Sequence, residues 1–310
     1  MGSALLSYIT LFGGALLYAA ASVMFFIDIA RAGNGRVIGE GARAGQVRLR
    51  KAPILLAAAG VFHFAYISSA SFVAHVCPVD SVHFILSMIA VLATFFYIGA
   101  RGFRRDKARR DNLDALGLII APLGLAFLLG TYFVEKPVAG PTLGSGFIAL
   151  HVIVNLVGIA LFILAGAAAT LYLVQERRLK AKRLESVKNL PPLDTLDRAE
   201  HRFLIAGFPL LTIGIVTGTF WSRQLEFGTP TEVMRIVFGY ATWLLIAGVL
   251  LLRVAAGWRG RRSAYGTILG LICALGVLVV YLTRPSPAPV GDQAARSNAP
   301  VASISTPGER

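Results

Sequence analysis

The chain has 310 residues, of which 56% are apolar and 15% are charged, and its 30 Lys and Arg against 16 Asp and Glu give a formal net charge of +14. About a quarter of the residues are charged in a typical soluble domain. The composition excludes a disordered chain and disfavours a soluble globular protein, because one or two cores could not bury so much apolar surface. It predicts an all-α polytopic membrane protein. The positive charge fits either a nucleic-acid-binding protein or the basic cytoplasmic loops of a membrane protein.

Eight apolar segments reach the length of about 20 residues that a membrane-spanning helix needs. They cover residues 4–30, 53–74, 81–100, 113–134, 146–174, 203–222, 233–254 and 264–283. Their polarity does not alternate as in the strands of a β-barrel. The first segment lacks a basic leading region and a small-residue cleavage site, so we expect a retained helix and not a signal peptide. We expect one eight-helix domain over 1–283 and a disordered external tail over 284–310.

The basic residues are concentrated in every second loop between these segments. Four alternate loops hold 24 of the 30 Lys and Arg. The positive-inside rule predicts that these four loops are cytoplasmic, which places both chain termini outside. The expected location is therefore the inner, cytoplasmic membrane of the cell. Because the arginines are divided among loops and no nucleic-acid-binding module is visible, we expect the bilayer and not a nucleic acid as the partner of this charge.

The longest basic loop, residues 175–202, has internal structure of its own. Its first part, QERRLKAKRLE, continues the fifth helix into the cytoplasm, and Pro191 and Pro192 end that part. Asp194 or Thr195 is a suitable N-cap for a short interfacial helix that precedes the sixth span. In the spans themselves, small residues at Gly214 and Gly218 and at Gly266 and Gly270 predict close contact between helices.

The five histidines carry most of the chemical information. His63 lies midway along the second span, whereas His75, His83 and His151 lie at the predicted outer face, and His201 lies on the cytoplasmic side. An ionisable residue inside a bilayer is a candidate functional residue, and a neutral imidazole can ligate haem iron through one nitrogen while the other is hydrogen-bonded. The alternatives are a histidine hydrogen-bonded within the bundle or one reaching to the interface. We expect His201 to be a plain interfacial residue.

Other catalytic and metal sites find no support in the sequence. There is no HxxxH or HExxH motif, and no carboxylate cluster accompanies the histidines in the predicted spans. No Ser/His/Asp arrangement and no Gly-rich phosphate loop occurs in a suitable setting. The sequence therefore predicts no independent catalytic activity.

Several stretches of the second half resemble the cytochrome c assembly protein family. These stretches are Leu150-His151-Val152, LYLVQERRLK at 171–180, Leu196-Asp197-Arg198, His201-Arg202, GFPLLTIGI at 207–215, Gly218, Trp221 and GWRGRR at 257–262. The resemblance covers mainly residues 146–283 and is weaker over 53–100, where His63 and Cys77-Pro78-Val79 match the second helix and the following loop. Eight helices in one chain are similar to the CcsA-like and HemX/YpjD-like branch of this family.

The resemblance implies a role in handling haem, which CcsA-type members prepare for attachment to apocytochromes c outside the membrane. It implies that His151 stands where the family has an external haem ligand, and that His63 stands where the family often has a histidine. The sequence also departs from the pattern. The tryptophan-rich loop expected after Trp221 is replaced by SRQLEFGTP, Leu251 stands at the position of an expected in-membrane histidine, and no histidine follows the last helix. We therefore expect the HemX/YpjD-like branch or a diverged subunit.

Three functions remain open at this stage. The first is a haem-handling protein of cytochrome c biogenesis in which His151 is an axial ligand, with His75 or His83 as its partner and His63 as a further candidate. Its partners would be haem and other cytochrome c maturation proteins or an apocytochrome c. The second is a non-catalytic assembly or regulatory subunit without haem, and the third is a haem b electron-transfer subunit. A transporter is disfavoured, because no inverted repeat is visible.

Overall fold

The computed structural model describes residues 2–34, 51–74, 82–102, 113–133, 146–182, 190–222 and 230–282. Within these ranges the protein is all-helical, and eight helices are long and apolar enough to cross a membrane. The helices are α1 (Gly2–Asn34), α2 (Lys51–Ala74), α3 (Val82–Gly102), α5 (Asp114–Phe133), α6 (Gly146–Lys180), α8 (Leu193–Ser222), α9 (Pro230–Ala255) and α10 (Arg261–Leu282). This confirms the predicted fold class and makes the chain a multi-pass membrane protein.

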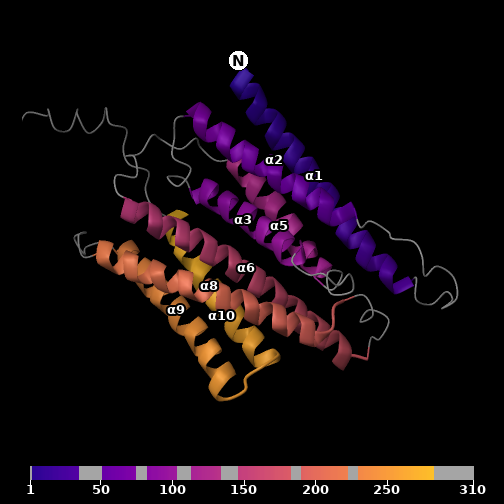
Figure 1. The fold of residues 1–310 in the computed structure, drawn as a ribbon, viewed down its shortest axis with the longest axis vertical. Coiled ribbons are helices and arrows are strands. Elements are labelled where there is room, and N and C mark those ends of the chain that lie inside the picture. The colour runs from indigo at the N-terminus through magenta and orange to yellow at the C-terminus, as the bar shows by residue number, and fades with distance from the viewer. Residues whose placement is uncertain are drawn as a thin grey trace, which may run out of the picture.

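The helices form two groups that meet along α6 (Figure 1). In the first group α1 packs against α2 and α5, and α3 packs against α2 and α5. In the second group α6 packs against α8 and α10, and α9 packs against α10 and α8. Contacts of α6 with α3 and α5 join the two groups. Helix α6 is therefore the centre of the bundle, since 72% of its span is buried inside the protein, against 17% for α9.

Successive helices run in opposite directions through the bundle (Figure 1). The end of α3, the end of α6, the start of α8, the end of α9 and the start of α10 consequently gather at one end. The described basic residues of the predicted inner loops lie at that end, and they include Arg101, Arg177, Arg198, Arg253 and Arg261. The opposite end holds the starts of α3 and α6. We call these the basic end and the histidine end of the bundle.

The small-residue spacings do mark close helix contacts. A Cβ added at Gly214 would lie 2.5 Å from Oδ1 of Asn155, and one at Gly218 would lie 2.9 Å from Cε1 of His151, so side chains of α6 occupy the space above these glycines of α8. Gly266 and Gly270 of α10 admit Val249 and Ile246 of α9 in the same way. Without side chains at these positions, the helix backbones approach one another closely.

The prediction of a separate interfacial helix before the sixth span is wrong. Helix α8 runs without interruption from Leu193 to Ser222, although Pro209 lies inside it. Neither Asp194 nor Thr195 is the N-cap, because the carbonyl oxygen of Pro192 accepts the N–H of Thr195 over 2.9 Å. Helix α6 ends at Lys180, and Pro191 and Pro192 stand directly before the new helix, where a proline is tolerated because it has no N–H to lose. The predicted tail over 284–310 lies outside the described residues.

Candidate functional site

His63 occupies the centre of the first helix group and has no solvent exposure. Its Nδ1 lies 3.2 Å from the hydroxyl oxygen of Tyr18 on α1. Its Nε2 is hydrogen-bonded to the hydroxyl of Ser87 on α3. The Tyr18 hydroxyl also lies 3.3 Å from Oγ1 of Thr94, so one buried network joins α1, α2 and α3. Both ring nitrogens are engaged in this arrangement, and the role of His63 as a haem ligand stays a prediction.

His151 lies in the second turn of α6, half-buried against α8. Its Nδ1 is 3.0 Å from Oγ1 of Thr217. That hydroxyl lies 2.8 Å from the carbonyl oxygen of Ile213, to which it can donate its own proton while it accepts from the histidine. A neutral ring with its proton on Nδ1 satisfies both contacts and keeps a lone pair on Nε2. This is the arrangement in which a histidine is held ready to ligate a metal.

Asn155 and two glycines fix the position of the His151 ring. The amide nitrogen of Asn155 donates to the backbone oxygen of His151 over 2.7 Å and lies 3.4 Å from each ring nitrogen. Gly218 and Gly214 of α8 leave the space into which the ring and the Asn155 amide fit. Among the described side chains Nε2 is approached by the Asn155 amide nitrogen at 3.4 Å, and the backbone of Gly214 also hydrogen-bonds the ring. A haem held through Nε2 would replace a long side-chain contact.

The other predicted ligands are less closely grouped. His83 lies in the first turn of α3 at the same end as His151, and its Nδ1 is 3.8 Å from the place of a Cβ on Gly130 of α5. The two rings thus lie on neighbouring helices but contact different helices, α5 for His83 and α8 for His151. His75 lies outside the described residues. No group of three or more His, Cys, Asp and Glu that could hold a metal ion occurs in the described ranges.

A second polar site, at the basic end, is built from α8, α9 and α10. Arg253 is in the last turn of α9 and is 9% exposed. Its guanidinium forms a bidentate ion pair with Asp197 of α8, with Nη1 donating to Oδ1 over 3.1 Å and Nη2 donating to Oδ2. Nη1 also lies 3.3 Å from Oγ of Ser263 on α10. One arginine side chain therefore joins three helices.

Glu200 extends this network one helical turn further into the bundle. Oγ of Ser263 donates to its Oε1 over 2.8 Å, and Oγ1 of Thr267 donates to the same oxygen over 2.6 Å. Its Oε2 is buried and has no hydrogen-bond partner among the described residues. The side chain as a whole has no solvent exposure. A fully buried carboxyl group at a helix junction holds the start of α10 against α8.

The turn between α9 and α10 contributes a backbone N–H to the buried network of Asp197, Glu200 and Arg253. Gly257 and Gly260 have φ angles of +65° and +67°, which glycine adopts far more readily than other residues. Gly257 follows the end of α9, and the N–H of Trp258 bonds back to the carbonyl oxygen of Leu252 over 3.1 Å. The N–H of Gly260 then donates to Oδ1 of Asp197 over 2.7 Å. The string GWRGRR is therefore the turn that closes this buried site.

Sequence reasoning missed the buried network. It predicted a short interfacial helix before the sixth span and basic cytoplasmic loops, whereas the structure buries Asp197 and Glu200 of α8 together with Arg253 of α9. Two signals point to the site in hindsight. Asp197 and Glu200 are three residues apart and so share a helix face, and Arg253 follows an uncharged run over residues 236–252 of α9. His201, predicted to be interfacial, follows Glu200 directly in α8 and is half-buried.

Comparison with known protein families shows which family the chain belongs to. The sequence model of the family described as Cytochrome C assembly protein matches residues 50–284, which is well over half of the chain. The chain belongs to the cytochrome c assembly protein family. The His151 site and the buried Asp197–Arg253 network both lie inside the matched region.

Three curated relatives of this chain share the description cytochrome c biogenesis protein CcsA. The cytochrome c biogenesis protein CcsA of Guillardia theta is 30% identical over 200 residues, which cover 54% of this chain and 64% of that protein. The CcsA of Gloeothece citriformis is 37% identical over 101 residues, 30% of this chain and 29% of the relative. The CcsA of Chlamydomonas reinhardtii is 29% identical over 174 residues, which cover 54% of this chain and 46% of that protein. The chain thus spans less than two thirds of these relatives' lengths. No solved structure matches it.

Proposed function

We propose that this protein acts in cytochrome c biogenesis and holds haem at the outer face of the inner membrane through Nε2 of His151. The observation that carries the proposal is the hydrogen bond between Nδ1 of His151 and Thr217, which leaves Nε2 with the long 3.4 Å approach of Asn155 among the described side chains. Family membership supports haem as the cargo. In this role haem is the group destined for an apocytochrome c, and the protein's part is to bind and orient it.

The distribution of basic residues supports the proposed orientation of the bundle in the membrane, with His151 near the outer face. Basic residues of the described helices gather at the end of the bundle opposite to His151 (Figure 1). By the positive-inside rule that end faces the cytoplasm. His151 and His83 then lie near the outer surface, where an apocytochrome c and other maturation proteins are accessible. His83, in the first turn of α3 at that end, is the proposed second axial ligand, and His75, which the sequence predicts at the outer face, is the alternative.

In this proposal the two helix groups have different roles. Nε2 of His151 would bind the iron, while Thr217 holds its Nδ1 and Asn155 holds the helix turn beneath the ring. The His63 network would keep α1, α2 and α3 together. Leu251 stands where a further histidine was expected, and it is 66% exposed on α9. Among the described residues, the proposed contacts of His151 and His83 with haem lie at the histidine end of the bundle.

A gene deletion with complementation tests the proposal. We expect loss of the gene to remove covalently bound haem from c-type cytochromes, seen by haem staining of denaturing gels, while b-type cytochromes remain. The wild-type gene and His201→Ala, a histidine at the opposite end, should restore staining, and His151→Ala should not. If His151→Ala restores staining fully, the haem-ligand role is wrong, and the chain acts as an assembly subunit without haem. Normal staining in the deletion strain would contradict a role in cytochrome c biogenesis altogether.

A further inference from the structure

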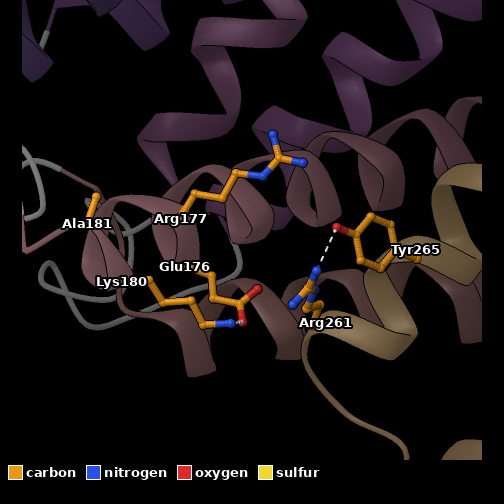
Figure 2. A pocket seen from close by; sticks show the side chains of 6 residues that line it. All are labelled: Glu176, Arg177, Lys180, Ala181, Arg261 and Tyr265. Carbon is orange, nitrogen blue, oxygen red and sulfur yellow. Dashed lines mark hydrogen bonds and ion pairs between the residues drawn. The ribbon is translucent and has the colours of Figure 1, made fainter.

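A cleft of about 400 Å³ opens at the basic end, between the last turn of α6 and the first turn of α10. Its lining consists of Glu176, Arg177, Lys180, Ala181, Arg261 and Tyr265 (Figure 2). The only carboxylate in this lining, Glu176, forms an ion pair with Lys180 at 2.7 Å. The two arginines therefore leave the cleft with an excess of positive charge.

The two arginines of the cleft are available to an anion. Neither Arg177 nor Arg261 has a carboxylate within 4.0 Å among the described residues. Arg261 is held in place by Tyr265, whose ring centroid lies 5.4 Å from its Cζ and whose hydroxyl lies 3.5 Å from Nη2 (Figure 2). Two guanidinium groups and a phenolic hydroxyl are donors that suit a phosphate group, because a guanidinium presents paired N–H donors to phosphate oxygens.

The depth of the cleft matches the headgroup region of a bilayer. Helix α10 has 22 residues and is therefore about 33 Å long, while the hydrocarbon core of a bilayer is about 30 Å thick. Its first turn, with Arg261 and Tyr265, then lies where the hydrocarbon ends. Tyrosine is enriched at that level of membrane proteins.

An apolar stripe continues from the cleft along α10. Leu269, Ile272 and Val279 are exposed and follow Tyr265 at spacings of four, three and seven residues, which place them on one helix face. The cleft and the stripe together present donors for a phosphate next to an apolar surface long enough for acyl chains. A free phosphate ion would use the cleft alone.

We propose that this cleft binds the phosphate of an anionic phospholipid of the inner leaflet, with its acyl chains along the stripe on α10. Arg177 and Arg261 contact the phosphate, and the Tyr265 hydroxyl donates to it. The proposal does not depend on haem binding by His151. Its consequence is that a specific lipid joins the end of α6 to the start of α10, next to the turn that closes the buried Asp197–Arg253 network.

Native mass spectrometry of the full-length chain in detergent tests this proposal, with phosphatidylglycerol and phosphatidylcholine as probes. We expect the first phosphatidylglycerol to bind more tightly than phosphatidylcholine. The double variant Arg177→Gln/Arg261→Gln should weaken phosphatidylglycerol binding about tenfold or more, because each cation near an anionic lipid contributes measurably to binding. The control is Arg259→Gln/Arg262→Gln, which removes the same charge from exposed positions at the same end that do not line the cleft.

Each outcome bears on the proposal. Loss of affinity in the cleft variant and retention in the control supports it, provided that both variants unfold at the wild-type temperature. Equal losses in the two variants would show diffuse attraction to the basic end and overturn the proposal. Equal binding of the two lipids would overturn it as well. Displacement of the lipid by low millimolar inorganic phosphate would identify a free-phosphate site in place of a lipid site.

Discussion

Replacing Arg253 by Met is expected to lower the free energy of unfolding by about 3–5 kcal/mol, because it leaves the buried carboxylate of Asp197 without its counter-charge. The bidentate pair is almost fully buried, and the same guanidinium also reaches Ser263 of α10. The measurement is denaturant unfolding of the purified protein in mixed micelles, with the free energy extrapolated to zero denaturant.

Matched variants separate the buried pair from general charge effects. Arg259→Met removes an exposed cation from the adjacent turn and should change stability by no more than about 0.5 kcal/mol. The double variant Asp197→Leu/Arg253→Met should be more stable than either single variant, because it leaves no unpaired buried charge. If Arg253→Met and Arg259→Met have equal stability, the buried network does not hold the three helices together.

Replacing Gly260 by Ala is expected to cost about 2–5 kcal/mol of stability. The left-handed backbone conformation accounts for about 1–2 kcal/mol. Crowding accounts for the rest, since overpacking costs about 1–3 kcal/mol and the new Cβ would lie 2.4 Å from the hydroxyl oxygen of Tyr172. Displacement of the turn would also strain the hydrogen bond from the Gly260 N–H to Asp197.

Gly257 provides a matched control for this substitution, because its φ angle is nearly the same and a Cβ there would meet no atom within 4 Å. Gly257→Ala should therefore show only the backbone cost of about 1–2 kcal/mol. Adding Tyr172→Phe to Gly260→Ala should recover part of the crowding cost. Equal losses for the two glycine variants, measured by the same unfolding assay, would show that crowding by Tyr172 plays no part.

The sequence predicted the fold through properties that act over whole segments. A run of about twenty apolar residues predicts a membrane-spanning helix without any knowledge of the helices that pack against it. For this reason the sequence predicted all eight helices. Helix ends were harder, because they depend on local hydrogen bonds. At the start of α8 the carbonyl oxygen of Pro192 accepts the first helical hydrogen bonds, where the cap by Asp194 or Thr195 was expected. The helix then continues through Pro209.

The candidate sites were predicted less completely, because they depend on which side chains meet across helices. His151 was identified by its position at a helix end, but the role of Thr217 in orienting its ring required the packing of α6 against α8. His63 was identified by its depth in the membrane, and only the structure shows the partners of both its ring nitrogens. The Asp197–Arg253 pair joins residues 56 positions apart, and no local pattern in the sequence connects them.

The spectrum of the purified protein tests the central proposal, haem binding through His151, most directly. The chain is purified in detergent from haem-replete cells, and its reduced-minus-oxidised spectrum is recorded. We expect haem bands in the wild-type protein and in His201→Ala, their loss in His151→Ala, and a weakening of haem affinity by about tenfold or more in Thr217→Val, which removes the acceptor that orients the ring. A wild-type protein without haem, or bands that persist unchanged in a folded His151→Ala variant, would contradict the proposal.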